Sequence, residues 1–157
     1  MLAKTIENKK QLMAALLTRD TFDAFETVSG SVTTYAVFSV NGQWHGSFYP
    51  DEETSHDFTP WNLLRPYFLS VIRGRNTPLA FQFVFRLPDG EMSALIEKEA
   101  ISRELTADVS GLLLNLSFDG TSILLTTGVS HRTFSLDRTL ERAWDNYAQQ
   151  RFGEFFD

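Results

Sequence analysis

The sequence contains no cysteine among its 157 residues. Disulfides, thiolate nucleophiles and cysteine-ligated metals are therefore excluded. Uninterrupted apolar runs are also short, and none approaches the ~18 residues that suggest a membrane-spanning helix. The opening residues MLAKTIE lack the basic segment and apolar stretch of a secretory signal. These absences predict a cytoplasmic protein that does not enter a membrane.

Basic residues are in the minority, with 14 Lys and Arg against 20 Asp and Glu, which gives a net charge of -6. This surplus of negative charge disfavours nucleic acid and anionic membranes as partners, although a local basic patch keeps nucleic acid as an alternative. Three common catalytic signatures are missing as well: the Gly-Lys-Ser/Thr phosphate loop, His-Glu-x-x-His and Gly-x-Ser-x-Gly. We therefore predict no cofactor and no metal.

Apolar residues are plentiful, at 43% of the chain, and phenylalanine alone occurs 14 times. A chain of this length and composition can bury one sizeable core, so we expect a single domain over residues 1–157. Phe81, Phe83 and Phe85 alternate along the sequence. Alternation of this kind is typical of a strand with one face in the core.

Two dipeptides, Asn41-Gly42 and Asp119-Gly120, predict the tight turns of two β-hairpins, because Asn, Asp and Gly tolerate positive φ. In the first hairpin, residues 35–40 would pair with residues 43–48. Neither face of this hairpin would be wholly apolar. Its aromatic face could therefore meet a ligand or a partner.

The second hairpin would place Phe118 opposite Thr121 and Leu112 opposite Thr127. This register makes one face almost wholly apolar, and we expect that face in the core. The other face carries mainly serine, threonine and asparagine side chains and should be solvated or lightly covered.

The remaining pattern predicts further strands and four main helices. Expected strands cover residues 2–6, 25–29, 79–87 and 129–134, and expected helices cover 9–17, about 60–73, 91–99 and a last segment from Asp137. The order is strand, helix, three strands, helix, given twice. We predict an α+β fold, with antiparallel hairpins in one or two sheets and helices packed on one face.

This doubled order resembles the strand-helix-three-strand units of the DNA sliding clamps. The likeness is one of element order without shared motif residues, so it is an analogy of fold. Residues 149–156 also have the outline of a clamp-binding peptide, with a glutamine followed by an apolar residue and two aromatics. A tail that packs back on the core is the simpler interpretation.

Several local phrases together resemble an uncharacterised family of small proteins from gut Firmicutes, a domain of unknown function. The phrases are DTFD (20–23), LRP (64–66), FDGTS (118–122), TTG (126–128), TFSLD (133–137) and AWD (143–145). The resemblance spans nearly the whole chain. It implies a bacterial cytoplasmic protein and brings no activity and no catalytic residues.

Aromatic residues supply the first candidates for a binding surface. Trp44, His45 and Tyr49 lie in the first predicted hairpin, and Trp61 begins a predicted helix. Tryptophan and tyrosine contribute much of the energy at protein interfaces. Cross-strand packing is the plainer role for His45, and a place in the core is an alternative for both tryptophans.

Arginines supply the second group of candidates. Arg73 and Arg75 flank Gly74 at the predicted end of a helix, and Arg65 lies two turns earlier. Such a cluster could bind a phosphate or a partner's carboxylate. The helix dipole alone would also favour positive charge at that position.

The acidic segment 51–57 could offer oxygen ligands to a divalent ion, but its spacing matches no known metal loop, and a solvated loop is the simpler interpretation.

Three functional hypotheses therefore stay open. The first is a non-catalytic binding or protein-interaction module with an unknown protein or small-molecule partner. The second is a clamp-like or nucleic-acid-associated accessory protein. The third is a small enzyme that uses His45 with the carboxylates of 51–57, without any visibly paired nucleophile and base. The oligomeric state is left open.

Overall fold

The computed structural model describes residues 1–52 and 55–156. Its strands form one seven-stranded antiparallel sheet in the order β1-β7-β6-β5-β2-β3, with β4 beside β2. The strands are β1 (Ala3–Thr5), β2 (Glu26–Thr33), β3 (Val37–Asn41), β4 (Thr59–Pro60), β5 (Ala80–Arg86), β6 (Val109–Phe118) and β7 (Ile123–His131). The helices are α1 (Lys9–Leu17), α2 (Trp61–Ile72), α3 (Asp89–Lys98), α4 (Arg103–Thr106) and α5 (Thr139–Phe152), with short 3-10 turns η1 (Gly46–Phe48) and η2 (Gly153–Phe155).

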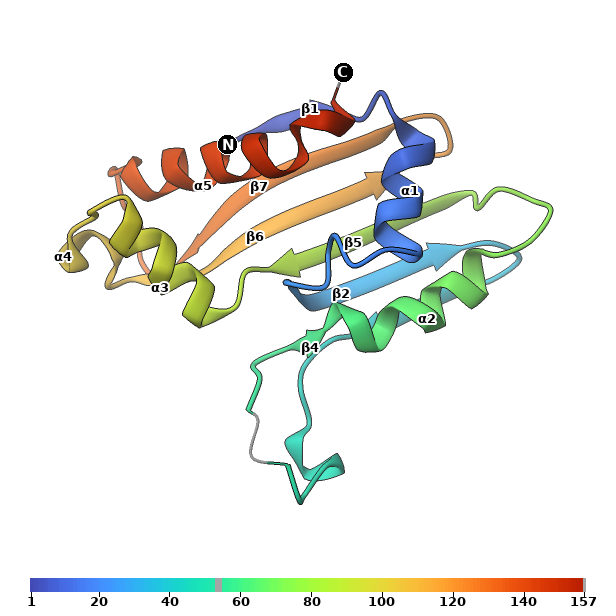
Figure 1. The fold of residues 1–157 in the computed structure, drawn as a ribbon, viewed down its shortest axis with the longest axis horizontal. Coiled ribbons are helices and arrows are strands. Elements are labelled where there is room, and N and C mark those ends of the chain that lie inside the picture. Colours follow the sequence, from blue (N-terminus) through green and yellow to red (C-terminus); the bar gives the residue numbers. More distant parts are fainter. Residues whose placement is uncertain (53–54, 157) are drawn as a thin grey trace.

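Helices α1, α2 and α5 lie over one face of the sheet, while α3 and α4 lie at one end (Figure 1). The predicted α+β class, with antiparallel strands and helices on one face, is confirmed. The helix spacing of apolar residues placed α1 at its observed bounds, and the alternating phenylalanines placed β5 within one residue at each end of it.

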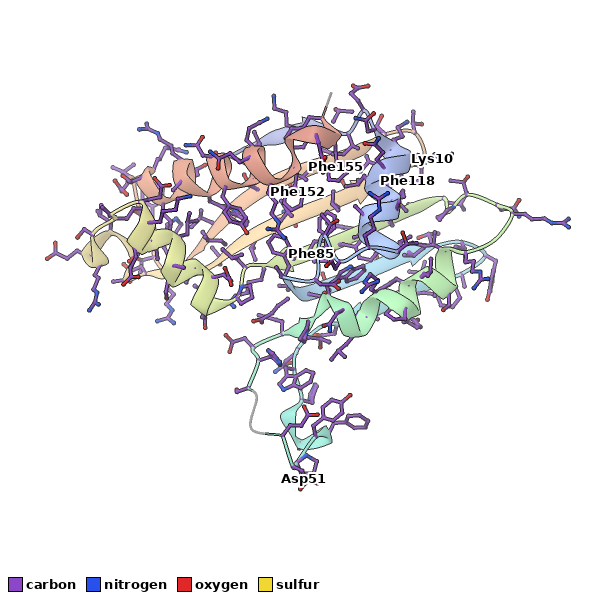
Figure 2. The ribbon with its side chains drawn as sticks, in the orientation of Figure 1. Lys10, Asp51, Phe85, Phe118, Phe152 and Phe155 are labelled. Carbon is purple, nitrogen blue, oxygen red and sulfur yellow. The ribbon has the colours of Figure 1, made fainter. Side chains whose placement is uncertain are left out.

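The core between the helices and the sheet is strongly aromatic. The ring of Phe22 stacks on Phe85 of β5, with centroids 5.4 Å apart, and on Phe152 of α5 at 5.0 Å. Figure 2 shows Phe85 and Phe152 directed into this space. Phe155 and Phe156 are buried too, so the C-terminal segment packs on the core as expected.

The hairpin at Asp119-Gly120 forms, but its loop has four residues where two were predicted. Phe118 pairs with Ile123, and the Asp119 carboxylate accepts hydrogen bonds from the amides of Thr121 and Ser122, each at 2.8 Å. Gly120 has a φ of 99°, which accounts for a glycine there. Because the register moves by two residues, each side chain keeps its predicted face.

The predicted hairpin at Asn41-Gly42 is wrong. β3 pairs with β2 across a turn at residues 34–36, and residues 43–48 form no partner strand. Gly42 is needed for a different reason: an added Cβ would lie 1.7 Å from the carbonyl oxygen of Thr27 in β2. The chain then leaves the sheet as an arm, described over residues 43–52 and 55–58, which extends away from the body in Figure 1.

The predicted order of strand, helix, three strands and helix, given twice along the chain, holds only in part. β7 runs through Gly128 to His131, so the strand predicted over residues 129–134 is the end of β7 and not a separate strand. Gly30 lies inside β2, where the absence of a side chain leaves room for the rings of Phe68 and Phe83. β1 lies at one end of the sheet beside β7, while β2 pairs with β5 near the other end. The two halves therefore occupy the sheet in different ways.

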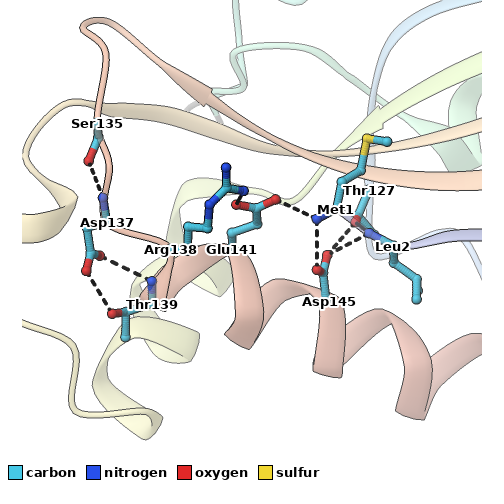
Figure 3. Close-up of polar contacts among 9 residues, drawn as sticks. All are labelled: Met1, Leu2, Thr127, Ser135, Asp137, Arg138, Thr139, Glu141 and Asp145. Carbon is cyan, nitrogen blue, oxygen red and sulfur yellow. Dashed lines mark hydrogen bonds and ion pairs between the residues drawn. The ribbon is translucent and has the colours of Figure 1, made fainter.

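A polar network attaches the first residues to α5 (Figure 3). The Met1 ammonium group pairs with Glu141 and Asp145, and Asp145 also accepts hydrogen bonds from the Leu2 amide and the Thr127 hydroxyl. The nearby ammonium group lowers the pKa of Glu141. These contacts hold β1, β7 and α5 together.

Candidate functional site

A groove lies on the face of the sheet opposite the three helices. Because Phe83 and Phe85 face the helices, Val84 and Arg86 face the other way. The groove has a volume of about 940 Å³. It is lined by Val28, Ser29, Ser39, Val40, Asn41, Gln43, Asp57, Phe58, Arg86, Ser110, Gly111, Leu113 and Ser130.

Arg86 is the central polar residue of this groove, and its side chain is only 9% exposed. Its Nη2 donates to Asp89 Oδ1 at 2.7 Å and to the carbonyl oxygen of Ser110 at 3.0 Å. Its Nη1 lies 4.0 Å from Glu26 and 3.6 Å from Asp57 but has no hydrogen-bond acceptor among the described residues. A buried donor without an acceptor is uncommon and costly in a folded protein.

Glu26 lies beside Arg86 at the start of β2 and is almost fully buried. Its Oε2 accepts a hydrogen bond from the Phe58 amide at 2.8 Å. Burial raises the pKa of Glu26, while that hydrogen bond and Arg86 act in the opposite direction. The Phe58 ring also lies 5.8 Å from the Arg86 guanidinium carbon, so the Glu26–Arg86 pair anchors the base of the arm.

Local irregularities in the sheet make room for Arg86. The β6–β7 register shifts between Val109 and Gly111, which is typical of a β-bulge. An added Cβ at Gly111 would lie 2.9 Å from Arg86 Nε. A glycine beside the bulge therefore allows the arginine stem to lie flat across β6.

The arm holds three of the predicted binding residues. Trp44 stacks on Tyr49 with centroids 5.7 Å apart and meets the edge of His56 at 5.2 Å, whereas His45 is exposed and precedes η1. Phe48, a neighbour that the prediction omitted, is 77% exposed. Asp51 marks the far end of the arm in Figure 2, and part of the predicted acidic segment, residues 53–54, lies outside the described residues.

Trp61 does not belong to any exposed surface. It is fully buried, its Nε1 donates to the Leu16 carbonyl oxygen at 2.9 Å, and it stacks on Phe68. The prediction that it joins a binding surface is corrected, because the start of α2 packs under α1. Arg65 is also occupied, since its Nε and Nη2 donate to the two carboxylate oxygens of Asp23 at 3.1 and 2.8 Å.

Arg73 and Arg75 are exposed in the loop after α2, where they border a hollow of about 490 Å³ with Tyr35 and Leu79. Figure 1 places this loop at the end of α2 distant from the arm. The sequence-predicted residues are thus divided among the arm, the core, the ion pair that Arg65 of α2 forms with Asp23, and this loop, and they do not form one surface.

Arg86 and Glu26 were missed by sequence analysis. Each of these charged residues lies inside a predicted strand, and that was the available signal. The alternation of apolar and polar residues along a strand, taken alone, assigns such a charge to the solvated face. Their contact depends on the pairing of β2 with β5, which brings Glu26 opposite Arg86 from 60 residues away in the sequence.

A comparison with known families matches residues 15–155 to a family of unknown function, DUF5721. The chain belongs to that family. The DUF5721 range includes every residue of the groove and the whole arm. Membership of a domain family of unknown function, expected from the local phrases, is thereby confirmed. No curated protein and no solved structure gives a significant match.

Two further properties of the described residues concern membranes and metal ions. In residues 1–52 and 55–156, no helix has the length and apolar character to cross a bilayer. Within the same ranges, no three His, Asp or Glu side chains converge in a geometry that could hold a metal ion.

Proposed function

We propose that this DUF5721 protein is a non-catalytic binding protein, and that the groove around Arg86 holds its ligand. The observation that carries the proposal is Arg86 Nη1, a buried donor that borders the groove and lacks a hydrogen-bond acceptor among the described residues. A ligand oxygen in the groove would supply that acceptor and remove the cost of the unmade bond.

The charge around Arg86 restricts the ligand. Its single positive charge already has three carboxylates nearby, from Glu26, Asp57 and Asp89. A further anion would be repelled by these groups, in a protein whose net charge is already -6. The acceptor that Nη1 requires is therefore an uncharged carbonyl or hydroxyl oxygen.

The walls of the groove agree with a neutral polar ligand. Ser29, Ser39, Asn41, Gln43 and Ser130 contribute hydroxyl and amide groups, which can both donate and accept hydrogen bonds. Apolar side chains, including Leu113 and Phe58, line the rest. A small molecule with several hydroxyl or carbonyl groups and some apolar surface fits this mixture.

The groove supports binding more than catalysis. Its described lining has no histidine, lysine or tyrosine, and its one carboxylate, Asp57, is paired with Arg86 at 3.6 Å. The Ser110 hydroxyl lies 2.7 Å from the Ser130 hydroxyl and is not paired with a base. An activated nucleophile needs such a base within hydrogen-bond reach.

The test is a thermal-shift screen followed by calorimetry, with neutral sugars, nucleosides and N-acetylated amides as one set and carboxylates and phosphates as the other. We expect at least one neutral compound to bind and to raise the melting temperature. Ser29→Leu fills the groove floor and should abolish binding. Ser117→Leu changes the same sheet face outside the groove and should retain it. Binding by the anionic set alone, or full binding by Ser29→Leu, would contradict the proposal.

Protein binding by the arm is a second candidate. It is favoured by Phe48, which is highly exposed beside the stacked Trp44 and Tyr49. Exposed aromatic groups on a projecting segment are typical of interface anchors. A photoreactive phenylalanine analogue at position 48 should give one defined cross-linked product in cells, and Trp44→Ala should abolish it. The same analogue at exposed Phe134 should not form that product.

A further inference from the structure

β3 is the last strand at one edge of the sheet, opposite the edge formed by β1, and its outer side carries unpaired backbone groups. Gly42 N donates to Val28 O at 2.9 Å, which fixes the alternation: Val40 and Phe38 bond to β2, and Val37, Ser39 and Asn41 point their backbone groups outward. β2 is the only described strand that pairs with β3.

This edge lacks the devices that usually protect an edge strand. Residues 27–50, which include β3 and all of β2 after Glu26, contain no Asp, Glu, Lys or Arg, although 22% of the chain is charged. β3 itself has no proline and no bulge against β2, and it is rich in residues that favour strands. Val37 is 64% exposed, and Tyr35, at the tip of the turn, is 93% exposed. An exposed strand of this kind is expected to pair with another strand.

We propose that β3 pairs with β3 of a second copy of this chain, antiparallel, about a two-fold axis at Ser39. That register places Ser39 opposite Ser39, Phe38 opposite Val40 and Val37 opposite Asn41. Similar side chains then lie side by side. The apolar Phe38 and Val40 of both copies lie on the helix side of the sheet, and Val37, Ser39 and Asn41 of both copies lie on the groove side. All five residues of β3 are paired, and the outward amides and carbonyls gain partners.

Charge favours a second copy over an unrelated peptide. Two copies that each carry a net charge of -6 can approach closely only through a surface free of acidic groups, and residues 27–50 provide one. An acidic protein that captured peptides would be expected to place carboxylates along the edge to attract a basic segment. β3 has none.

The absence of cysteine makes the register directly testable by single-cysteine variants. In Ser39→Cys, the two thiols would lie across the axis, with Cα atoms ~5.5 Å apart, which suits a disulfide. We expect mild oxidation to give a covalent dimer. Val37→Cys should not cross-link, because the axis separates its two copies by several residues. Gln82→Cys is the matched control, on the same row of the sheet but two strands inward.

Sedimentation of the unmodified protein gives an independent result. We expect twice the 17.9 kDa chain mass. Ser39→Lys and Ser39→Asp should both sediment as monomers, because each puts like charges opposite one another, whereas Gln82→Lys should stay dimeric. Circular dichroism confirms that each variant is folded.

A monomeric native protein, dimers of the two Ser39 variants, or equal cross-linking at positions 37, 39 and 82 would overturn the proposal. The first of these outcomes would leave the edge to a segment of another protein.

Discussion

Replacing Arg86 by leucine should expose the electrostatic cost of burying Glu26. Arg86 Nη1 lies 4.0 Å from the Glu26 carboxylate, and both side chains are over nine-tenths buried. At an effective dielectric constant of ~20, their attraction is about 4 kcal/mol. Removal of one partner from a buried pair typically costs about 3–5 kcal/mol, since the other charge is left uncompensated. We therefore expect Arg86→Leu to lower the free energy of unfolding by about 3–5 kcal/mol near neutral pH.

The pH dependence has a defined sign. Burial raises the pKa of Glu26 above its ordinary value of 4.5. The stability contributed by this group is therefore complete below that value and is lost as the pH rises through the folded-state pKa. Without Arg86, the pKa of Glu26 rises further, so protonation can neutralise the carboxylate in mildly acidic solution. The cost of Arg86→Leu should thus be smaller at about pH 5 than at about pH 7.

Urea denaturation at both pH values, followed by tryptophan fluorescence, measures this difference. Glu26→Gln in the Arg86→Leu background should recover most of the loss, because no buried charge then remains. Arg65→Leu is the control: its partner Asp23 is about a fifth exposed, against less than a tenth for Glu26, and we expect a smaller cost, about 1 kcal/mol. An equal cost of Arg86→Leu at the two pH values, or a further loss from Glu26→Gln, would refute the reasoning.

Three other predictions test the fold. Gly42→Ala puts a Cβ 1.7 Å from a β2 carbonyl oxygen and should cost about 3 kcal/mol in urea denaturation, whereas Gly74→Ala meets nothing within 4 Å and should cost less than about 1 kcal/mol. Trp61→Ala should cost about 3–5 kcal/mol by thermal unfolding, against about 0.5 kcal/mol or less for exposed Phe48→Ala. Backbone amides lower the pKa of Asp119, so its stabilising effect, measured against an alanine variant, should hold at neutral pH and vanish as the pH falls through that lowered pKa.

Elements with a strong local period were predictable from the sequence. α1 and β5 have apolar residues at the spacing of one buried face, and the structure places them within a residue of the predicted bounds. The second hairpin was also found, although its loop is two residues longer. The error did not matter for the core, because a shift of two residues keeps every side chain on its face.

The first hairpin failed because one dipeptide had two physical explanations. Asn41-Gly42 is suited to a tight turn with positive φ, but Gly42 is also the residue that a close backbone approach requires. The actual partner of β3 is the upstream segment Glu26–Thr33, whose serines and glycine gave a weaker strand pattern. A local rule cannot separate these explanations, since the difference lies in which distant strand is adjacent.

The candidate site was less predictable than the fold for the same reason. Trp44 was assigned to a hairpin and Trp61 to a helix start, but neither local pattern indicates that Trp61 lies under α1 and Trp44 on the arm. Arg86 and Glu26 each look like a solvated charge until β2 and β5 are paired. Burial and contact at these positions are set by long-range register, which the periodicity of a single segment does not contain.

The sheet separates stability from recognition by its two faces. Along β5, Phe81, Phe83 and Phe85 pack under the helices, while Gln82 and Val84 face the groove side. Side chains on the groove side can therefore change without loss of core packing, except at Arg86, whose buried charge is tied to Glu26 and to the arm. If two β3 edges pair about a perpendicular axis, both groove faces point to the same side of one continuous sheet. Two ligand sites would then open in the same direction, a geometry suited to a ligand with repeated units.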